Sequence, residues 1–174
     1  TVPVSLYDPF GAEQGPALLL PNGNAIFFGS SGHTATYTPS GTASPGTWVA
    51  GPDIPNGQGM PDAPGAMMVN GRILLAVSPV PTAVNVYPAP TSFYEYDYVT
   101  NSFAQVDSPT GGATFGEPAF PMLMLDLPDG SVLFMHRNTD LYVYRPYGAP
   151  LAAGKPAIAS ISANSDGSLH LTGT

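Results

Sequence analysis

The sequence predicts an all-β fold, and three observations carry that prediction. Glycine and proline together make up about a quarter of the 174 residues, which is typical of short strands joined by tight turns. Charged residues reach only 9% while apolar residues reach 43%, a balance that argues against a disordered chain. An Asn-Gly or Asp-Gly pair between two apolar runs occurs three times along the chain, which is a strong hairpin signal.

The three pairs predict β-hairpins over residues 18–29, 67–76 and 125–135. Asn-Gly and Asp-Gly favour a two-residue type I′ turn, in which both central residues have a positive φ. The runs on either side of each pair are apolar without alternation, so we expect both strands of each hairpin to be buried in the core.

A third and a fourth strand follow these hairpins. Third strands are predicted at residues 36–39, 94–98 and 141–146, and fourth strands are expected to begin near Trp48 and Phe103. Residues 4–9 match the third strand and are assigned to a preceding unit.

Three tyrosines, Tyr94, Tyr96 and Tyr98, share one face of their predicted strand. Exposed tyrosines suit contacts with carbohydrate or protein, but we expect most of these three to pack between units.

The hairpins repeat with a regular period. Their turn glycines lie at positions 23, 71 and 130, so the spacings are 48 and 59 residues. A kelch propeller blade has four strands and a period of about 50 residues. A β-sandwich with three unrelated hairpins is the alternative, but three hairpins in register favour the propeller.

Residues 121–150 resemble the last blade of the galactose-oxidase-like kelch family, through the segments Leu127–Phe134 and Asp140–Pro146. In that family the last blade leads into an immunoglobulin-like domain, whose first strands residues 155–161 and 168–174 resemble. The resemblance implies about three kelch-type β-propeller blades over residues 1–150. It also implies a linker and the first strands of an immunoglobulin-like sandwich over residues 151–174. Because three blades do not close a ring, it implies a longer parent protein.

The chemistry of that family is not expected in this segment. Its members hold copper with two tyrosines and two histidines, and one tyrosine is cross-linked to a cysteine. The family's Tyr-His pair corresponds here to Glu13-Gln14, Pro61-Asp62 and Phe120-Pro121, and the chain contains no cysteine. We therefore predict a non-catalytic protein without a cofactor or metal site. A fragment of a copper oxidase whose active site lies on absent blades is the alternative.

The loops that enter the first strand of each blade meet at one end of a propeller. Here they carry a set of polar side chains that would form an acidic binding mouth for a cation or for sugar hydroxyls: Glu13, Gln14, Asp62 and Glu117. The alternative is that these side chains merely solvate ordinary loops. Two loop histidines, His33 and His136, have no neighbouring histidine or cysteine in sequence, so we expect solvated or hydrogen-bonded structural roles for them.

The net charge disfavours some classes of binding partner. The formal net charge is −8 with only four basic residues, which disfavours nucleic acids and anionic membrane surfaces. No apolar run approaches 18 residues, so we expect no membrane insertion. The scarcity of lysine and the excess of threonine, serine, glycine and proline favour a secreted protein. Together with the repeats, the low charge and the missing copper ligands, this predicts an extracellular, bacterial module that binds glycans, proteins or copies of itself. A self-assembling structural subunit is a third hypothesis.

Overall fold

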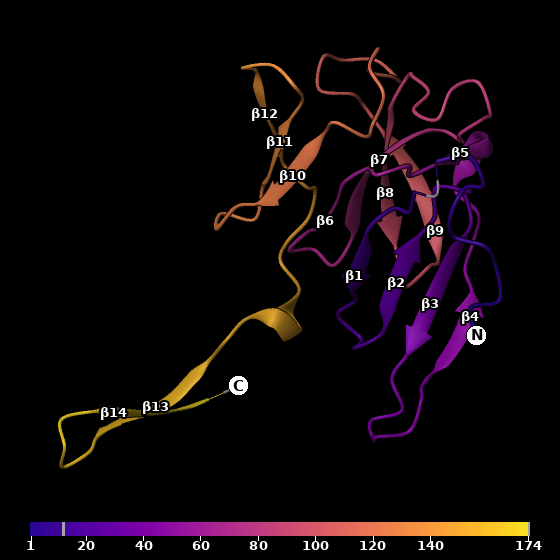
Figure 1. The fold of residues 1–174 in the computed structure, drawn as a ribbon. Helices are drawn as coiled ribbons and strands as arrows, with labels where there is room; N and C mark the ends of the chain where they lie inside the picture. The colour runs from indigo at the N-terminus through magenta and orange to yellow at the C-terminus, as the bar shows by residue number, and fades with distance from the viewer. Residues whose placement is uncertain (12, 174) are drawn as a thin grey trace.

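The computed structural model describes residues 1–11 and 13–173, and within them the fold is all-β, as the sequence predicts (Figure 1). The strands form four antiparallel sheets of two to five strands, and most neighbouring strands are consecutive in sequence. The helical segments of the described residues are two 3₁₀ turns, Pro55–Gly57 and Ala152–Gly154. No helix in the described part of the chain has the length and apolar character needed to cross a membrane.

The two larger sheets share one topology. The first sheet is a meander of four strands: β1 (Ala17–Leu19), β2 (Ala25–Phe28), β3 (Thr34–Thr38) and β4 (Thr47–Ala50). The second sheet repeats that meander: β6 (Gly65–Met67), β7 (Ile73–Pro79), β8 (Ser92–Asp97) and β9 (Ser102–Val106). A fifth strand, β5 (Gln58–Gly59), pairs with the far end of β7.

The remaining sheets are smaller. The third sheet contains three strands: β10 (Leu123–Asp126), β11 (Val132–Met135) and β12 (Leu141–Tyr144). The fourth is a hairpin of two strands: β13 (Ile158–Ala163) and β14 (Leu169–Gly173). Thr174, which ends the second strand predicted for this tail, lies outside the described residues.

The second and third strands of the first three sheets pair in one common register. The residue two places after each turn glycine lies opposite a tyrosine: Ala25 opposite Tyr37, Ile73 opposite Tyr96, and Val132 opposite Tyr144. The predicted third strands are therefore present and in register with one another. The predicted fourth strands are present as β4 and β9, which contain Trp48 and Phe103.

The turn type differs from the prediction. The Leu20 carbonyl accepts a hydrogen bond from the Gly23 N–H at 2.9 Å, and the Leu20 N–H donates to the Asn24 carbonyl at 2.7 Å. The loop therefore has three residues, and only its glycine has a positive φ, of 85°. The Asn22 Oδ1 accepts the Asn24 N–H at 3.1 Å, which holds the asparagine in an ordinary backbone conformation. This arrangement replaces the expected type I′ turn.

The same loop recurs in three other hairpins. Each has a positive-φ glycine and an Asn or Asp side chain that accepts the N–H two residues on: Asn70 with Gly71, Asp129 with Gly130, and Asp166 with Gly167. The last of these joins β13 to β14, a turn outside the three hairpins that the sequence predicts.

The larger of two hydrophobic clusters is shared by the faces of the first three sheets, and a smaller one lies between the second and third sheets. The Phe28 ring of β2 meets the Tyr96 ring of β8 edge-on, with 5.5 Å between the ring centroids. The Phe93 ring of β8 meets the Phe134 ring of β11 in the same way, with 5.3 Å between the centroids. Tyr94 and Tyr96 are both buried in this core, which confirms that these two tyrosines pack rather than face solvent.

The first strand of each hairpin is less buried than predicted. The second strands β2, β7 and β11 are largely buried, but Leu19 of β1 is 69% exposed, and Leu123 and Leu125 of β10 are each 60% exposed. An apolar run without alternation does not fix burial, because burial also requires a neighbouring layer on each face.

The N-terminal segment also departs from the prediction. Residues 4–9 form no strand. Instead, the Ser5 carbonyl accepts a hydrogen bond from the Ser31 hydroxyl at 2.6 Å, and the Leu6 carbonyl accepts one from the Ser30 hydroxyl at 3.4 Å. The Leu6 carbonyl also accepts the backbone N–H of Ser31 at 3.5 Å, so this segment contacts the loop after β2 through isolated hydrogen bonds and not through a strand ladder.

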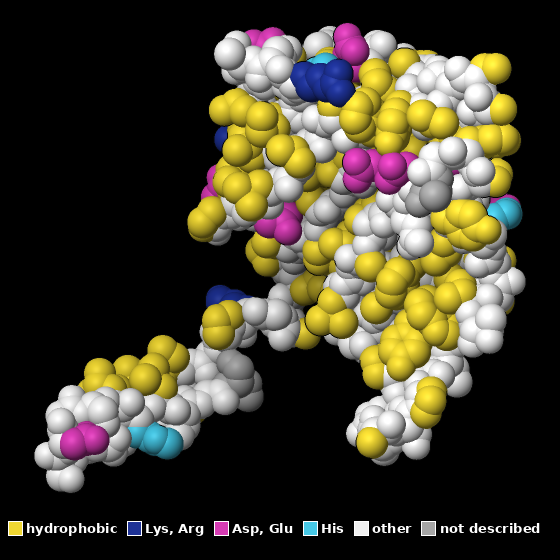
Figure 2. Space-filling model, viewed as in Figure 1, with side chains coloured by type: hydrophobic (Ala, Val, Ile, Leu, Met, Phe, Trp, Pro, Cys, Tyr) yellow, Lys and Arg dark blue, Asp and Glu magenta, His cyan; other side chains and the backbone are white. Residues whose placement is uncertain are grey.

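The C-terminal hairpin extends away from the three packed sheets (Figure 1). Every described residue of β13 and β14 is exposed. The strand register places its apolar residues on one face: Ile161, Ala163, Leu169 and Leu171. Hydrophobic side chains accordingly gather along one side of this arm (Figure 2).

Candidate functional site

Two polar arrangements are candidates for a functional site. The first, here called the loop cluster, is formed by side chains from loops of all three packed sheets: Glu13, Asp62, Tyr87, Phe120 and Arg137. The second, here called the buried network, joins the second sheet to the third: Arg72, Glu95, Asp97 and Tyr144.

The loop cluster centres on Tyr87, in the loop between β7 and β8. Its hydroxyl donates to the Glu13 Oε1 at 2.8 Å. Its ring stacks on Phe120, which precedes β10, with centroids 4.1 Å apart and planes 28° apart. On the same Phe120 ring lies the Arg137 guanidinium, 4.8 Å from the centroid. The cluster therefore combines a carboxylate, two aromatic rings and a cation.

The Glu13 loop is fixed by a buried aspartate. The Asp8 carboxylate is 2% exposed and accepts the backbone N–H groups of Phe10 at 2.8 Å, Gly11 at 2.6 Å and Glu13 at 3.2 Å. Burial alone would raise the pKa of Asp8, but the hydrogen bonds from these N–H groups and from Ser30 lower it below its ordinary value. Asp8 therefore stays ionised and holds the loop in shape.

A second carboxylate lies near Glu13. Although Asp62 is exposed, its pKa is raised, first by partial loss of solvent around the carboxyl group and second by the negative charge of Glu13. The pKa of Tyr87 is raised as well, first by its hydrogen bond to Glu13. Asp62 also has a φ of 49°, in the left-handed region that aspartate tolerates better than most residues.

The structure brings together only part of the predicted acidic mouth. The negative charge of Glu13 raises the pKa of Asp62, so these two carboxylates lie near one another. Gln14 is exposed and lines a shallow cavity beside the N-terminal segment, together with Val2 and Tyr7. The side chain of Glu117 is exposed, and its backbone carbonyl, not its carboxylate, is held by the Thr91 hydroxyl at 2.7 Å.

Sequence reasoning did not identify Tyr87, Phe120 or Arg137 as members of one site. Phe120 was noted only because it occupies a position corresponding to the family's Tyr-His pair. Tyr87 and Arg137 carry no local motif, because their meeting depends on how separate sheets pack.

The two loop histidines have different environments. The His33 Nδ1 lies 2.7 Å from the Asp53 Oδ1, and both side chains are largely exposed, so His33 is hydrogen-bonded as predicted. His136 is only 7% exposed, and its Nε2 has no hydrogen-bond partner among the described residues. Its ring instead meets Phe115 edge-on at 5.4 Å. The expectation of a solvated or hydrogen-bonded histidine is therefore wrong for His136.

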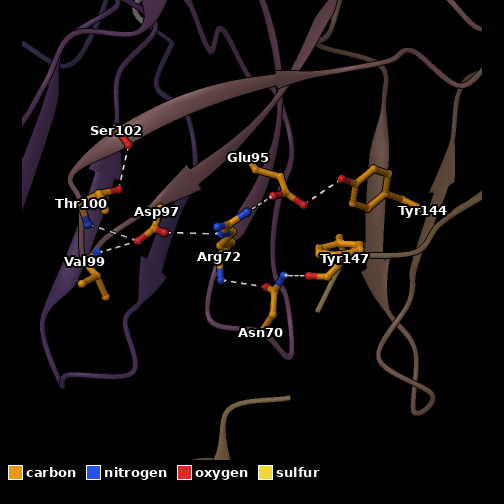
Figure 3. Close-up of polar contacts among 9 residues, drawn as sticks. All are labelled: Asn70, Arg72, Glu95, Asp97, Val99, Thr100, Ser102, Tyr144 and Tyr147. Atoms are coloured by element: carbon orange, nitrogen blue, oxygen red, sulfur yellow. Dashed lines mark hydrogen bonds and ion pairs between the residues drawn. The ribbon is translucent and has the colours of Figure 1, made fainter. Parts of the chain in front are cut away.

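The buried network surrounds Glu95, which is 6% exposed (Figure 3). The Arg72 Nη1 donates to its Oε2 at 2.9 Å, and the Tyr144 hydroxyl donates to its Oε1 at 2.8 Å. The Arg72 Nε also lies 3.5 Å from the Asp97 Oδ2. Burial, followed by the hydrogen bond to Glu95, raises the pKa of Tyr144, so this phenol remains a proton donor.

A backbone contact supports the buried network from the third sheet's side. The Asn70 side-chain amide donates to the Tyr147 carbonyl at 3.0 Å, and the Asn70 Oδ1 accepts the Arg72 N–H at 3.0 Å (Figure 3). The network thus joins the second sheet to the third through hydrogen bonds. A structural role explains all of its contacts.

No metal site accompanies either arrangement: within residues 1–11 and 13–173, no group of three or more His, Cys, Asp or Glu side chains lies close enough to hold an ion. No protein-family model matches the sequence, and no curated protein matches it either. The kelch-type resemblance therefore depends on the residues and strand patterns described above.

Proposed function

We propose that the chain forms blades of a kelch-type β-propeller that acts as a non-catalytic, secreted module for binding or assembly. Three meanders in a common register support the blade assignment, because a propeller blade is a four-stranded antiparallel sheet. The arrangement of the first strands supports it too, since β6 contacts both β1 and β10 (Figure 1). Further blades would complete the ring.

The C-terminal hairpin fits the same proposal as the first strands of an immunoglobulin-like sandwich. One face of the hairpin is apolar and the other carries Ser160, Ser162, His170 and Thr172. A sheet with this alternation is suited to cover a second sheet through its apolar face.

The observation that carries the binding role is the meeting of all three packed sheets at the loop cluster. Tyr87 joins Glu13 at the entrance of the first sheet to Phe120 at the entrance of the third. Carboxylates accept hydrogen bonds from sugar hydroxyls, and a partly exposed aromatic ring such as that of Tyr87 offers apolar surface. We therefore assign a glycan as the ligand of the loop cluster.

Isothermal titration calorimetry against a panel of neutral oligosaccharides tests this role. Glu13→Gln is expected to weaken binding about three- to tenfold, because the amide oxygen of glutamine still accepts a hydrogen bond but lacks the charge that strengthens it. Glu117→Gln is the matched control, because it also removes one loop carboxylate but lies outside the loop cluster. Equal effects of the two variants would contradict the assignment of the site.

The non-catalytic part of the proposal has its own test. The protein is incubated with Cu²⁺ and a primary alcohol, and hydrogen peroxide is measured. We expect no copper-dependent peroxide. Peroxide formation would instead favour the copper-oxidase hypothesis.

A further inference from the structure

Two buried polar atoms, one in the second sheet and one in the third, have no hydrogen-bond partner among the described residues. Ser78, near the end of β7, is fully buried, and its Oγ is unpaired. His136, directly after β11, is 7% exposed, and its Nε2 is unpaired. Buried polar atoms in folded proteins are nearly always hydrogen-bonded, either to protein or to ordered water, so the environment of these two atoms must be examined.

The strand register places Ser78 in a row of residues on one face of the second sheet. Val77 of β7 lies opposite Ser92 of β8, so the continued ladder places Ser78 opposite Thr91. Thr91 pairs on its other side with Phe115, through N–H to carbonyl hydrogen bonds of 2.8 Å and 2.7 Å. Because residues opposite one another in antiparallel strands point to the same face, Ser78, Thr91 and Phe115 share a face.

His136 lies over this row. Phe93, two residues after Thr91 and on the same face, meets the Phe134 ring of β11, so this face is the one that packs on the third sheet. The Phe115 ring meets both Phe134 and His136 edge-on, with 6.3 Å and 5.4 Å between the ring centroids. In the register that β7 and β11 share, His136 corresponds to the residue before Ser78. The two unpaired atoms therefore belong to facing surfaces at the same height.

A third polar atom belongs to this row. The Thr91 side chain is fully buried, and its hydroxyl donates to the Glu117 carbonyl at 2.7 Å, which leaves the lone pairs of Oγ1 free to accept a hydrogen bond. Ser78 Oγ and His136 Nε2 make no direct hydrogen bond to one another or to Thr91. Polar atoms that face one another without direct contact are commonly bridged by water.

We propose that one ordered water molecule binds between the second and third sheets, to His136 Nε2, Ser78 Oγ and Thr91 Oγ1. Three protein partners are the usual number for a buried water. Water suits this set because it can donate and accept, so it satisfies either tautomer of the imidazole. The set contains no carboxylate or thiolate, which makes a metal ion a poor occupant.

The water would connect the core to the loop cluster. His136 directly precedes Arg137, whose guanidinium packs on Phe120. Thr91 holds the Glu117 carbonyl, in the loop that leads to Phe120. The water therefore lies below both loops that bring Phe120 and Arg137 together. The site itself does not depend on the glycan assignment, since none of its atoms belongs to the loop cluster.

Magnetic relaxation dispersion of water oxygen, recorded on the full chain, counts the water molecules that stay bound for long times. Ser78→Val replaces the hydroxyl with methyl groups and should remove one long-lived water. His136→Phe should remove the same water by a different change, so the test does not depend on one variant folding. Ser131→Val is the matched control, because Ser131 is also buried but its hydroxyl binds Asp129. An unchanged count in both Ser78→Val and His136→Phe would overturn the proposal.

Urea denaturation of Ser78→Ala tests the same site by the sign of its effect. If the hydroxyl binds water, its loss should raise the unfolding equilibrium constant about three- to tenfold. If the hydroxyl is wholly unpaired, its loss should lower that constant, which would overturn the proposal. A raised constant together with an unchanged number of long-lived waters in Ser78→Val would indicate a direct bond from Ser78 to His136, and this result would also overturn the proposal.

Discussion

The strands β7 and β14 follow turns of the same kind, but β7 is buried and β14 is exposed. Asn70-Gly71 precedes β7 and Asp166-Gly167 precedes β14, and each pair combines a side-chain acceptor with a positive-φ glycine. Ile73 to Val77 of β7 are buried between neighbouring sheets, whereas Leu169 and Leu171 of β14 are 63% and 54% exposed. The turn chemistry is local and is encoded by three or four residues. Burial is supplied by the neighbouring sheets, so hairpins with equal local signals contribute unequally to stability.

The largest expected effect is on the core. Leu75→Ala in β7 removes a fully buried side chain and should lower the free energy of unfolding by about 2–5 kcal/mol. Leu171→Ala in β14 removes an exposed one and should change it by less than about 0.5 kcal/mol. Urea denaturation of both variants measures the difference, and similar midpoints would show that the hairpin packs as tightly as β7.

The buried network should give the next largest effect. Arg72→Met leaves the buried Glu95 carboxylate with only Tyr144 as a donor, and we expect a loss of about 2–3 kcal/mol. That is less than for a wholly buried pair, because the Arg72 side chain is 43% exposed.

Two further variants distinguish the network from a general charge effect. Arg145→Met removes an exposed arginine without an ion pair among the described residues and should have little effect. Adding Glu95→Gln to Arg72→Met should recover part of the lost stability, since the orphaned charge is gone. Failure to recover would mean that Arg72 acts through packing instead.

The turn glycines before β7 and β14 should also differ in their effect on stability. Alanine at either Gly71 or Gly167 would be forced into a positive φ of 84°, a strain of about 1 kcal/mol. At Gly71 the added methyl would also approach the Leu151 side chain within 2.6 Å, whereas nothing lies within 4 Å of it at Gly167. Gly71→Ala should therefore lower the free energy of global unfolding by about 1–2 kcal/mol. Gly167→Ala strains only the exposed hairpin of β13 and β14, so the free energy of global unfolding should not change. Thermal unfolding of the two variants compares them.

The smallest effect concerns pH. The pKa of Asp8 is lowered in the folded protein, so its contribution to stability is complete above its ordinary pKa of 3.8 and is lost as the pH falls through the lower, folded value. Asp8→Asn should flatten the acid side of the stability curve in this range. Unfolding midpoints of the two proteins between pH 2 and pH 6 measure this, and parallel curves would contradict the role given to Asp8.

The local parts of the fold were predictable from the sequence. Asn22-Gly23, Asn70-Gly71 and Asp129-Gly130 marked the hairpins correctly, because a positive φ and an Asx acceptor are properties of a few adjacent residues. Exposure of Leu19 and Leu123 was not predictable, since an apolar strand does not reveal whether a second layer covers it.

The candidate site was harder to predict for the same reason. Glu13 and Asp62 were found because they lie at repeated positions before first strands. Tyr87 and Arg137 reach Phe120 from loops that lie far away in sequence. The segment 4–9 shows the converse error: its residues match those of a predicted third strand, but its carbonyls make only isolated hydrogen bonds to Ser30 and Ser31.

The shared turn also determines how the protein would age chemically. Hydrolysis of the Asn22 side-chain amide would give aspartate, which keeps the oxygen that accepts the Asn24 N–H and is the residue already used at Asp129 and Asp166. The same hydrolysis at Asn70 would remove the amide that donates to Tyr147 and place a carboxylate against that carbonyl. Conversion to aspartate should therefore leave the first hairpin intact and loosen the junction between the second and third sheets, whereas isoaspartate, which adds a methylene to the backbone, would distort either turn.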